Sequence, residues 1–134
     1  MQSLKQFLQH SDLAMRCRRV SVNGDDPFLI SEPWALRQYS CELHRSNGDR
    51  QVKVIVGSDN RAPDFADVLD TVAAEAAVVD QAEGYEQWAL HMGFDPDSRH
   101  GERVYRAARR QAKLLRQLLG DEQYVKLLWL TERL

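Results

Sequence analysis

Residues 39–56 read YSCELHRSNGDRQVKVIV and contain the clearest local signal in the chain. Two segments in which apolar and polar residues alternate flank the dipeptide Asn47-Gly48. Asn-Gly in a two-residue loop is typical of the type I′ turn, whose twist suits antiparallel strands. Because such a turn sets the register of a hairpin, it predicts three pairs on the apolar face: Leu43 with Val52, Cys41 with Val54, and Tyr39 with Val56.

Residues 13–22, upstream of the hairpin, show the same alternation and predict another strand. If this strand pairs symmetrically with the first hairpin strand, Cys17 lies opposite Cys41 and Met15 opposite Leu43. The apolar residues of all three strands then share one face, which favours a three-stranded antiparallel meander. Residues 23–34 are expected to form a loop. The polar sheet face is a candidate second binding surface and carries Arg16, Arg18, His44 and Lys53.

After Gly57 the hydrophobic pattern is helical to the end of the chain. Residues 3–9 predict one earlier helix, which is too short to be stable alone and must dock on another element. Capping residues and apolar stripes predict four later helices: one that begins at Pro63-Asp64, one over residues 85–92, one from Asp95-Pro96 to Gly120, and one over residues 122–133 that Asp121 caps.

These elements predict an α+β fold. It consists of a three-stranded antiparallel β-meander with a short N-terminal helix, covered on one face by a C-terminal bundle of about four helices. A chain of 134 residues is the size of one domain, and it contains no internal repeat or low-complexity linker. We therefore expect a single domain over residues 1–134, with the helix and sheet in residues 1–57 and the helical half in residues 58–134.

The helix predicted to end at Gly120 is strongly amphipathic. At about 100° per residue its apolar side chains share one broad face. The opposite face carries the basic stripe, which consists of Arg99, Arg103, Arg106, Arg110 and Lys113. Residues 59–86, by contrast, contain eight acids and one base. Either the acidic and basic helices lie side by side and neutralise each other, or the basic stripe binds an acidic partner.

Motifs that would indicate catalysis are missing from the sequence. It contains no GxSxG, GxxxxGK[ST] or GxGxxG, and its two cysteines form no CxxC. His91 and His100 lie near Asp95 and Asp97 and could share a divalent ion, but their spacing matches no known motif. We therefore predict no enzyme, no cofactor and no metal. There is no secretory signal and no 18-residue apolar run, so we expect a cytoplasmic protein that does not span a membrane.

Residues 64–130 resemble small uncharacterised accessory proteins of bacteriophages and prophages. The resemblance lies in four features: Asp67-Val68-Leu69-Asp70, Tyr85-Glu86-Gln87-Trp88, the segment from Gly93 to Arg99 (GFDPDSR), and an Arg-rich helix that ends in Leu-Gly. It implies an origin in a mobile element and a location in the bacterial host cell. Proteins of this kind are often inhibitors of host defence, anti-CRISPR proteins among them, and the resemblance transfers no catalytic residue.

Two functions remain open at this point. The first is a non-enzymatic interaction protein that binds a host protein or ribonucleoprotein with an acidic surface, as an inhibitor of a host defence nuclease. The alternative is a nucleic-acid-binding or regulatory module that uses the basic helix, residues 96–119. A sequence-reading helix usually carries Asn, Gln and Ser among its arginines near the start of the helix, and here only Ser98 qualifies. No aromatic platform for base stacking interleaves with the basic stripe.

The last predicted helix carries consecutive apolar residues that point to more sides than one docking face covers. Either this helix is wedged into the core, or it forms a homodimer contact through Leu127, Trp129 and Leu130. The protein is accordingly expected to be a monomer or a homodimer.

Overall fold

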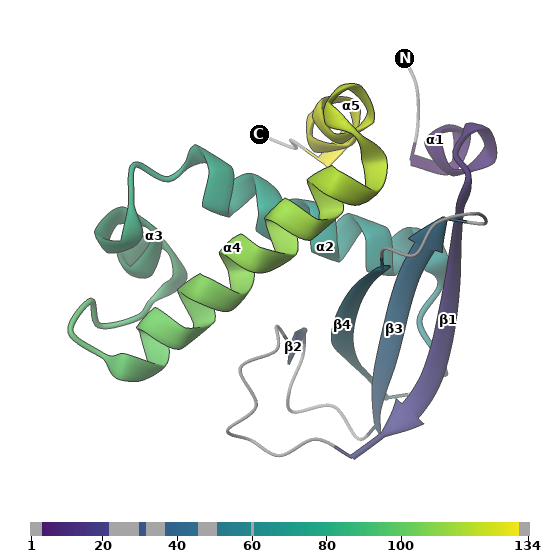
Figure 1. Cartoon of the computed structure of the whole chain (residues 1–134). Coiled ribbons are helices and arrows are strands. Elements are labelled where there is room, and N and C mark those ends of the chain that lie inside the picture. Colours follow the sequence, from purple (N-terminus) through teal and green to yellow (C-terminus); the bar gives the residue numbers. More distant parts are fainter. Residues whose placement is uncertain (1–3, 22–29, 32–36, 46–50, 60, 132–134) are drawn as a thin grey trace.

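The computed structural model describes residues 4–21, 30–31, 37–45, 51–59 and 61–131 (Figure 1). The elements in chain order are α1 (Leu4–His10), β1 (Leu13–Val20), β2 (Ile30–Ser31), β3 (Arg37–Arg45), β4 (Gln51–Ser58), α2 (Phe65–Gln81), α3 (Tyr85–Met92), α4 (Arg99–Leu119) and α5 (Asp121–Thr131). The predicted α+β fold is confirmed, because a short helix and a three-stranded antiparallel sheet precede four helices.

The register predicted from the apolar alternation is also confirmed. β1 pairs with β3 so that Cys17 lies opposite Cys41 and Met15 opposite Leu43. β3 pairs with β4 so that Leu43 lies opposite Val52 and Cys41 opposite Val54. The type I′ turn predicted at Asn47-Gly48 lies outside the described residues.

A fourth strand was not expected. Ile30 and Ser31, placed in a predicted loop, form β2 and pair in parallel with Ile55 and Val56. The order in the sheet is therefore β1-β3-β4-β2. Two residues are too few to show an alternation, and their pairing depends on a contact that is remote in sequence.

The core lies between the apolar face of the sheet and the helices. Cys41, Leu43 and Val52 of the sheet, each fully buried, belong to one cluster with apolar side chains of all five helices. Hydrogen bonds join α4 to the sheet: Arg45 Nη2 donates to the carbonyl oxygen of Leu119 at 2.9 Å, and Gln111 Nε2 donates to that of Lys53. In Figure 1, α4 crosses in front of α2, and α1 and α5 lie together at one end of the sheet.

The predicted start of α4 was wrong by three residues. Ser98, not Asp95, is the N-cap, and its side chain accepts a hydrogen bond from the backbone N–H of Gly101 at 3.2 Å. The carboxylate of Asp95 instead accepts from the N–H of Asp97 at 3.0 Å and stabilises a turn before the helix. Ser and Asp side chains both favour helix caps and turns. The sequence alone therefore does not show which of the two residues caps α4, and the backbone geometry decides it. The predicted stop is confirmed, because Gly120 has a φ of 84°.

Candidate functional site

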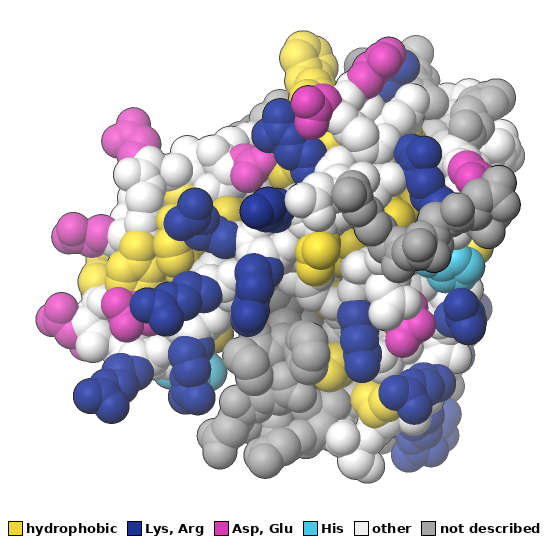
Figure 2. Space-filling model, in the orientation of Figure 1, with side chains coloured by type: hydrophobic (Ala, Val, Ile, Leu, Met, Phe, Trp, Pro, Cys, Tyr) yellow, Lys and Arg dark blue, Asp and Glu magenta, His cyan; other side chains and the backbone are white. Residues whose placement is uncertain are grey.

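The cationic face of α4 follows from the way this helix packs. Its small and aliphatic residues are buried against α2, α5 and the sheet: Ala107, Ala108, Ala112, Leu115, Leu118 and Leu119. Every Lys and Arg side chain of the helix is exposed, and these include all five residues of the predicted basic stripe. Figure 2 shows Lys and Arg side chains along α4 and over the strands, while most Asp and Glu side chains in this view lie toward the edges.

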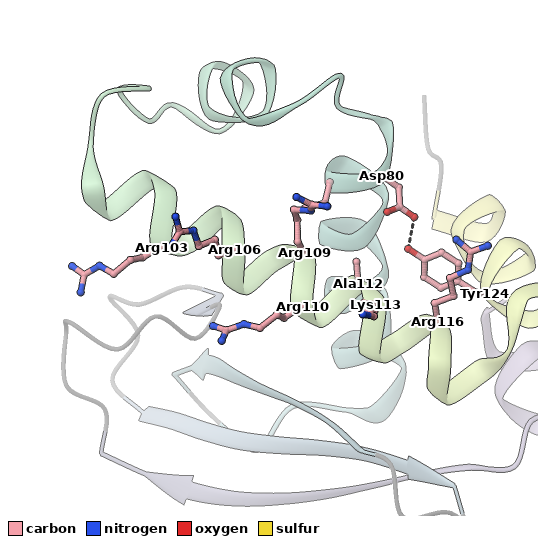
Figure 3. Close-up of a pocket in the computed structure, with 10 residues that line it drawn as sticks. Asp80, Arg103, Arg106, Arg109, Arg110, Ala112, Lys113, Arg116 and Tyr124 are labelled. Carbon is pink, nitrogen blue, oxygen red and sulfur yellow. Dashed lines mark hydrogen bonds between the residues drawn. The ribbon is translucent and has the colours of Figure 1, made fainter.

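A groove of about 750 Å³ runs along this face (Figure 3). Cations of α4 line it: Arg103, Arg106, Arg109, Arg110, Lys113 and Arg116. Ala112 and Val79 add apolar surface, and Asp80 of α2 and Tyr124 of α5 lie together at one end. We call this feature the α4 groove. It combines a high local positive charge with apolar surface and, among the described residues, a single carboxylate.

The end of the α4 groove near α5 is held by internal contacts. Tyr124 is 3% exposed, and its Oη donates a hydrogen bond to Oδ2 of Asp80 at 2.5 Å. Burial, and then this hydrogen bond, raises the pKa of Tyr124. Arg116 Nε donates to Asp121 Oδ1 at 2.8 Å, which raises the pKa of Arg116. The polar side chains at this end of the groove therefore already make hydrogen bonds within the protein, and they shape the groove rather than bind a partner.

In the part of the chain that the structure describes, the middle of the α4 groove has no such neutralising contacts. Among the described residues, no carboxylate oxygen lies within 4.0 Å of a cationic nitrogen of Arg103, Arg106, Arg110 or Lys113. Ion pairs between the basic stripe and the acids of α2, one of the two interpretations of the charge pattern, are thus not formed in this part of the chain. Arg109 contacts the ring of Tyr105, with its guanidinium carbon 5.7 Å from the ring centre.

The groove cations repeat every seven residues. Arg103, Arg106 and Arg109 are followed at that interval by Arg110, Lys113 and Arg116. Seven residues span two helical turns, or about 10 Å along the axis. A partner helix that lies along α4 and carries acids at the same interval would meet a cation at each repeat, as charged flanking positions do in paired helices.

The structure separates the remaining predicted site residues from the groove. Arg99 is exposed on the basic stripe but does not line the groove, whereas Arg109 and Arg116 line it and were missed. Each lies three residues after a stripe residue, Arg109 after Arg106 and Arg116 after Lys113, and this helical spacing was the signal that could have found them. Asp80 and Tyr124 come from other elements, and no local pattern connects them with α4.

The second predicted binding surface, on the polar face of the sheet, is only partly exposed to solvent. Arg16 and Arg18 are exposed on β1, but His44 and Lys53 are half-buried. Ser40, which lies beside Arg18 in the sheet, is 2% exposed, so the polar face is not uniformly open to solvent.

The predicted dimer contact needs a correction. Leu127 is fully buried in the core and is not available to a second copy, because α5 docks through it and Tyr124. Trp129 is 75% exposed, and Leu130 is half-buried.

Two of the four candidate metal residues make other contacts. The ring of His100 packs edge-on against Phe94, with centroids 5.7 Å apart, and Asp95 holds the turn before α4. Within the described segments, no group of three or more His, Cys, Asp or Glu side chains is placed to hold a metal ion. None of the helices in these segments combines the length and apolar composition that crossing a bilayer requires.

No model of a known protein family matches this chain, and no curated protein or solved structure matches it significantly. The α4 groove is therefore interpreted from its own geometry.

Proposed function

We propose that this protein is a non-enzymatic interaction protein that binds an acidic protein surface through the α4 groove. The observation that carries the proposal is the row of groove cations that have no carboxylate partner among the described residues. Charges of one sign gathered in a concave surface attract an oppositely charged partner and orient it during association.

Two features favour a protein segment over a phosphate backbone. Val79, which is half-buried, gives the groove apolar surface that a partner side chain can cover, and burial of such area contributes to affinity in most protein interfaces. The seven-residue repeat of the cations matches the repeat of one face of a helix. We propose that the bound segment is helical, with acidic residues at this interval.

The resemblance to phage and prophage accessory proteins supplies the proposed target class. A host defence nuclease, as a protein or as a ribonucleoprotein, is a target that such a protein would inhibit by covering an acidic surface. The target's identity rests on the resemblance, whereas the binding mode rests on the groove.

Nucleic acid binding is the second candidate function. One observation favours it: exposed cations are not confined to α4 but include Arg16, Arg18 and Arg19 on β1. A broad basic surface is the electrostatic signature of proteins that bind phosphates. Tyr124, the aromatic residue in the groove lining, is buried and offers no ring face for base stacking.

A matched pair of double variants tests the first proposal. Arg106→Glu with Lys113→Glu reverses two cations inside the groove, and Arg19→Glu with Arg99→Glu makes the same charge change outside it. In affinity capture from bacterial lysate, wild type and the outer variant should retain the same target, and the groove variant should lose it. Reversal of interfacial charges costs about 2–5 kcal/mol, or at least a tenfold loss of affinity. Equal capture by both variants at unchanged melting temperature would overturn the proposal.

A salt titration separates the two candidate functions. Binding of the wild type to a DNA duplex and to single-stranded RNA is measured as the salt concentration rises. Nonspecific phosphate contacts give dissociation constants of about 10⁻⁴–10⁻⁶ M and a steep decrease of affinity with salt. We expect no binding tighter than this range. Tighter binding that the groove variant abolishes would establish the nucleic acid function instead.

A further inference from the structure

Cys17 and Cys41 form a close thiol pair away from the α4 groove. They lie directly opposite each other in β1 and β3, and their Sγ atoms are 2.7 Å apart. A disulfide needs an S–S distance of about 2.0 Å and Cα atoms about 4.4–6.8 Å apart. Directly opposite residues of antiparallel strands have Cα atoms about 4.5–5.5 Å apart. The backbone therefore already holds the two thiols within reach of a covalent bond.

The two thiols differ in access. Cys17 is half-buried on β1, which is an edge strand, whereas Cys41 is fully buried. Burial, and the contact with Cys17, raises the pKa of Cys41 above its ordinary value, so this thiol stays protonated and unreactive toward solvent. An oxidant would therefore react with Cys17 first, and Cys41 would be the second, resolving thiol.

The surroundings of Cys17 indicate the class of oxidant. Arg19 is exposed two residues along β1 on the same sheet face as Cys17, and Arg16 and Arg18 are exposed on the opposite face of the strand. Positive charges concentrate small anions near the strand. A small disulfide that carries carboxylates, such as oxidised glutathione, combines the required charge with a suitable redox chemistry.

We propose that Cys17 and Cys41 are a reversible oxidation site that forms an intramolecular disulfide with an anionic small-molecule disulfide as the oxidant. The Cys17 thiolate attacks one sulfur of the small disulfide and releases one small thiolate, which leaves a mixed disulfide on Cys17. The Cys41 sulfur then attacks the Cys17 sulfur, and its proton passes to the second small thiolate as that group leaves. The protein loses two electrons and two protons, and the small disulfide becomes two thiols.

The bond would tie the edge strand to the centre of the sheet. It joins residues 24 positions apart and holds β1, with its exposed Arg16 and Arg18, against β3. Thiol–disulfide exchange with a small thiol reverses such a bond, so the modification is reversible.

Intact mass spectrometry of the full chain tests the site. The folded protein is incubated with oxidised glutathione, alkylated with iodoacetamide, and measured before and after dithiothreitol. We expect a monomer that has lost two hydrogens and carries neither an alkyl group nor a glutathione adduct, and dithiothreitol should restore both alkylatable thiols. Two thiols that remain alkylatable, a persistent glutathione adduct, or a disulfide-linked dimer would each overturn the proposal.

Two single variants test the order of reaction. Cys41→Ala should stop at a glutathione adduct on Cys17, because the resolving thiol is missing. Cys17→Ala should form no adduct while the protein is folded, because Cys41 is fully buried. An adduct on Cys41 in folded Cys17→Ala, with folding verified by circular dichroism, would show that Cys17 is not the entry point.

Discussion

At Glu75 of α2 the fold buries a carboxyl group among apolar side chains. Glu75 lines a cavity of about 120 Å³ together with Val78, Trp88, Met92 and Ala108. Within the described part of the chain, its Oε2 atom has no hydrogen-bond partner. Burial disfavours the charged form and raises the pKa of Glu75 from 4.5 to about 7. This residue therefore makes the stability of the fold depend on pH.

Glu75→Gln should remove that dependence. Between pH 4.5 and about 7 the folded protein keeps a proton that the unfolded chain releases, so stability falls as pH rises through this range. The loss reaches roughly 2–3 kcal/mol above pH 7. In urea denaturation the variant should match wild type at pH 5 and exceed it by about this amount at pH 8. An equal difference at both pH values would contradict the buried carboxyl.

At the scale of one element, the start of α4 depends on which polar side chain caps it. Ser98→Ala removes the hydrogen bond to the N–H of Gly101 and should lower the free energy of unfolding by about 1 kcal/mol. Asp95→Ala removes a bond in an exposed turn and should cost only a few tenths of that. Urea denaturation of the two variants checks the order. A larger loss for Asp95→Ala would place the functional cap at Asp95.

The sheet register makes a second prediction at this scale. Leu43 and Val54 are 0% and 2% exposed on the apolar face, so Leu43→Asp or Val54→Asp should unfold the domain by burying an unpaired carboxylate. Glu42, between Cys41 and Leu43 but half-buried on the other face, should tolerate Ala with little change in melting temperature. Similar melting temperatures for all three variants would refute the register.

At the scale of the whole molecule, the way acids and bases are distributed over the surface is more important for binding than the formal net charge of −2. Acids of α2 and bases of α4 belong to adjacent helices, yet the described residues show no ion pair between the basic stripe and α2. Because the stripe is exposed to water, its charges lower the stability of the free protein only slightly. A binding face can therefore coexist with a stable fold.

The exposed tail should not hold a dimer together. Large apolar side chains exposed on α5 are Val125 and Trp129, and a stable dimer buries about 1,200–2,000 Å² in total. We expect light scattering at high concentration to give the monomer mass. Trp129→Ala should leave the melting temperature unchanged, whereas Leu127→Ala should cost about 2–5 kcal/mol, because Leu127 is part of the core. A dimer mass that Trp129→Ala abolishes would contradict this expectation.

Local patterns in the sequence determined the three antiparallel strands, their register, and the exposed stripe from Arg99 to Lys113. The physical reason is that alternation and helical periodicity state directly which side of an element faces water. The cap at Ser98 was misassigned because Asp95 satisfies the same local preference, and only the path of the backbone chooses between them.

Tertiary structure alone decided the parallel strand β2, the buried position of Leu127, and the groove that joins Asp80 and Tyr124 to α4. These features combine residues that are far apart in the chain, so no periodicity within one element encodes them. The same holds for the missing ion pairs. Charge composition predicts that acidic and basic helices can attract each other, but whether their side chains meet depends on which faces the core requires them to bury.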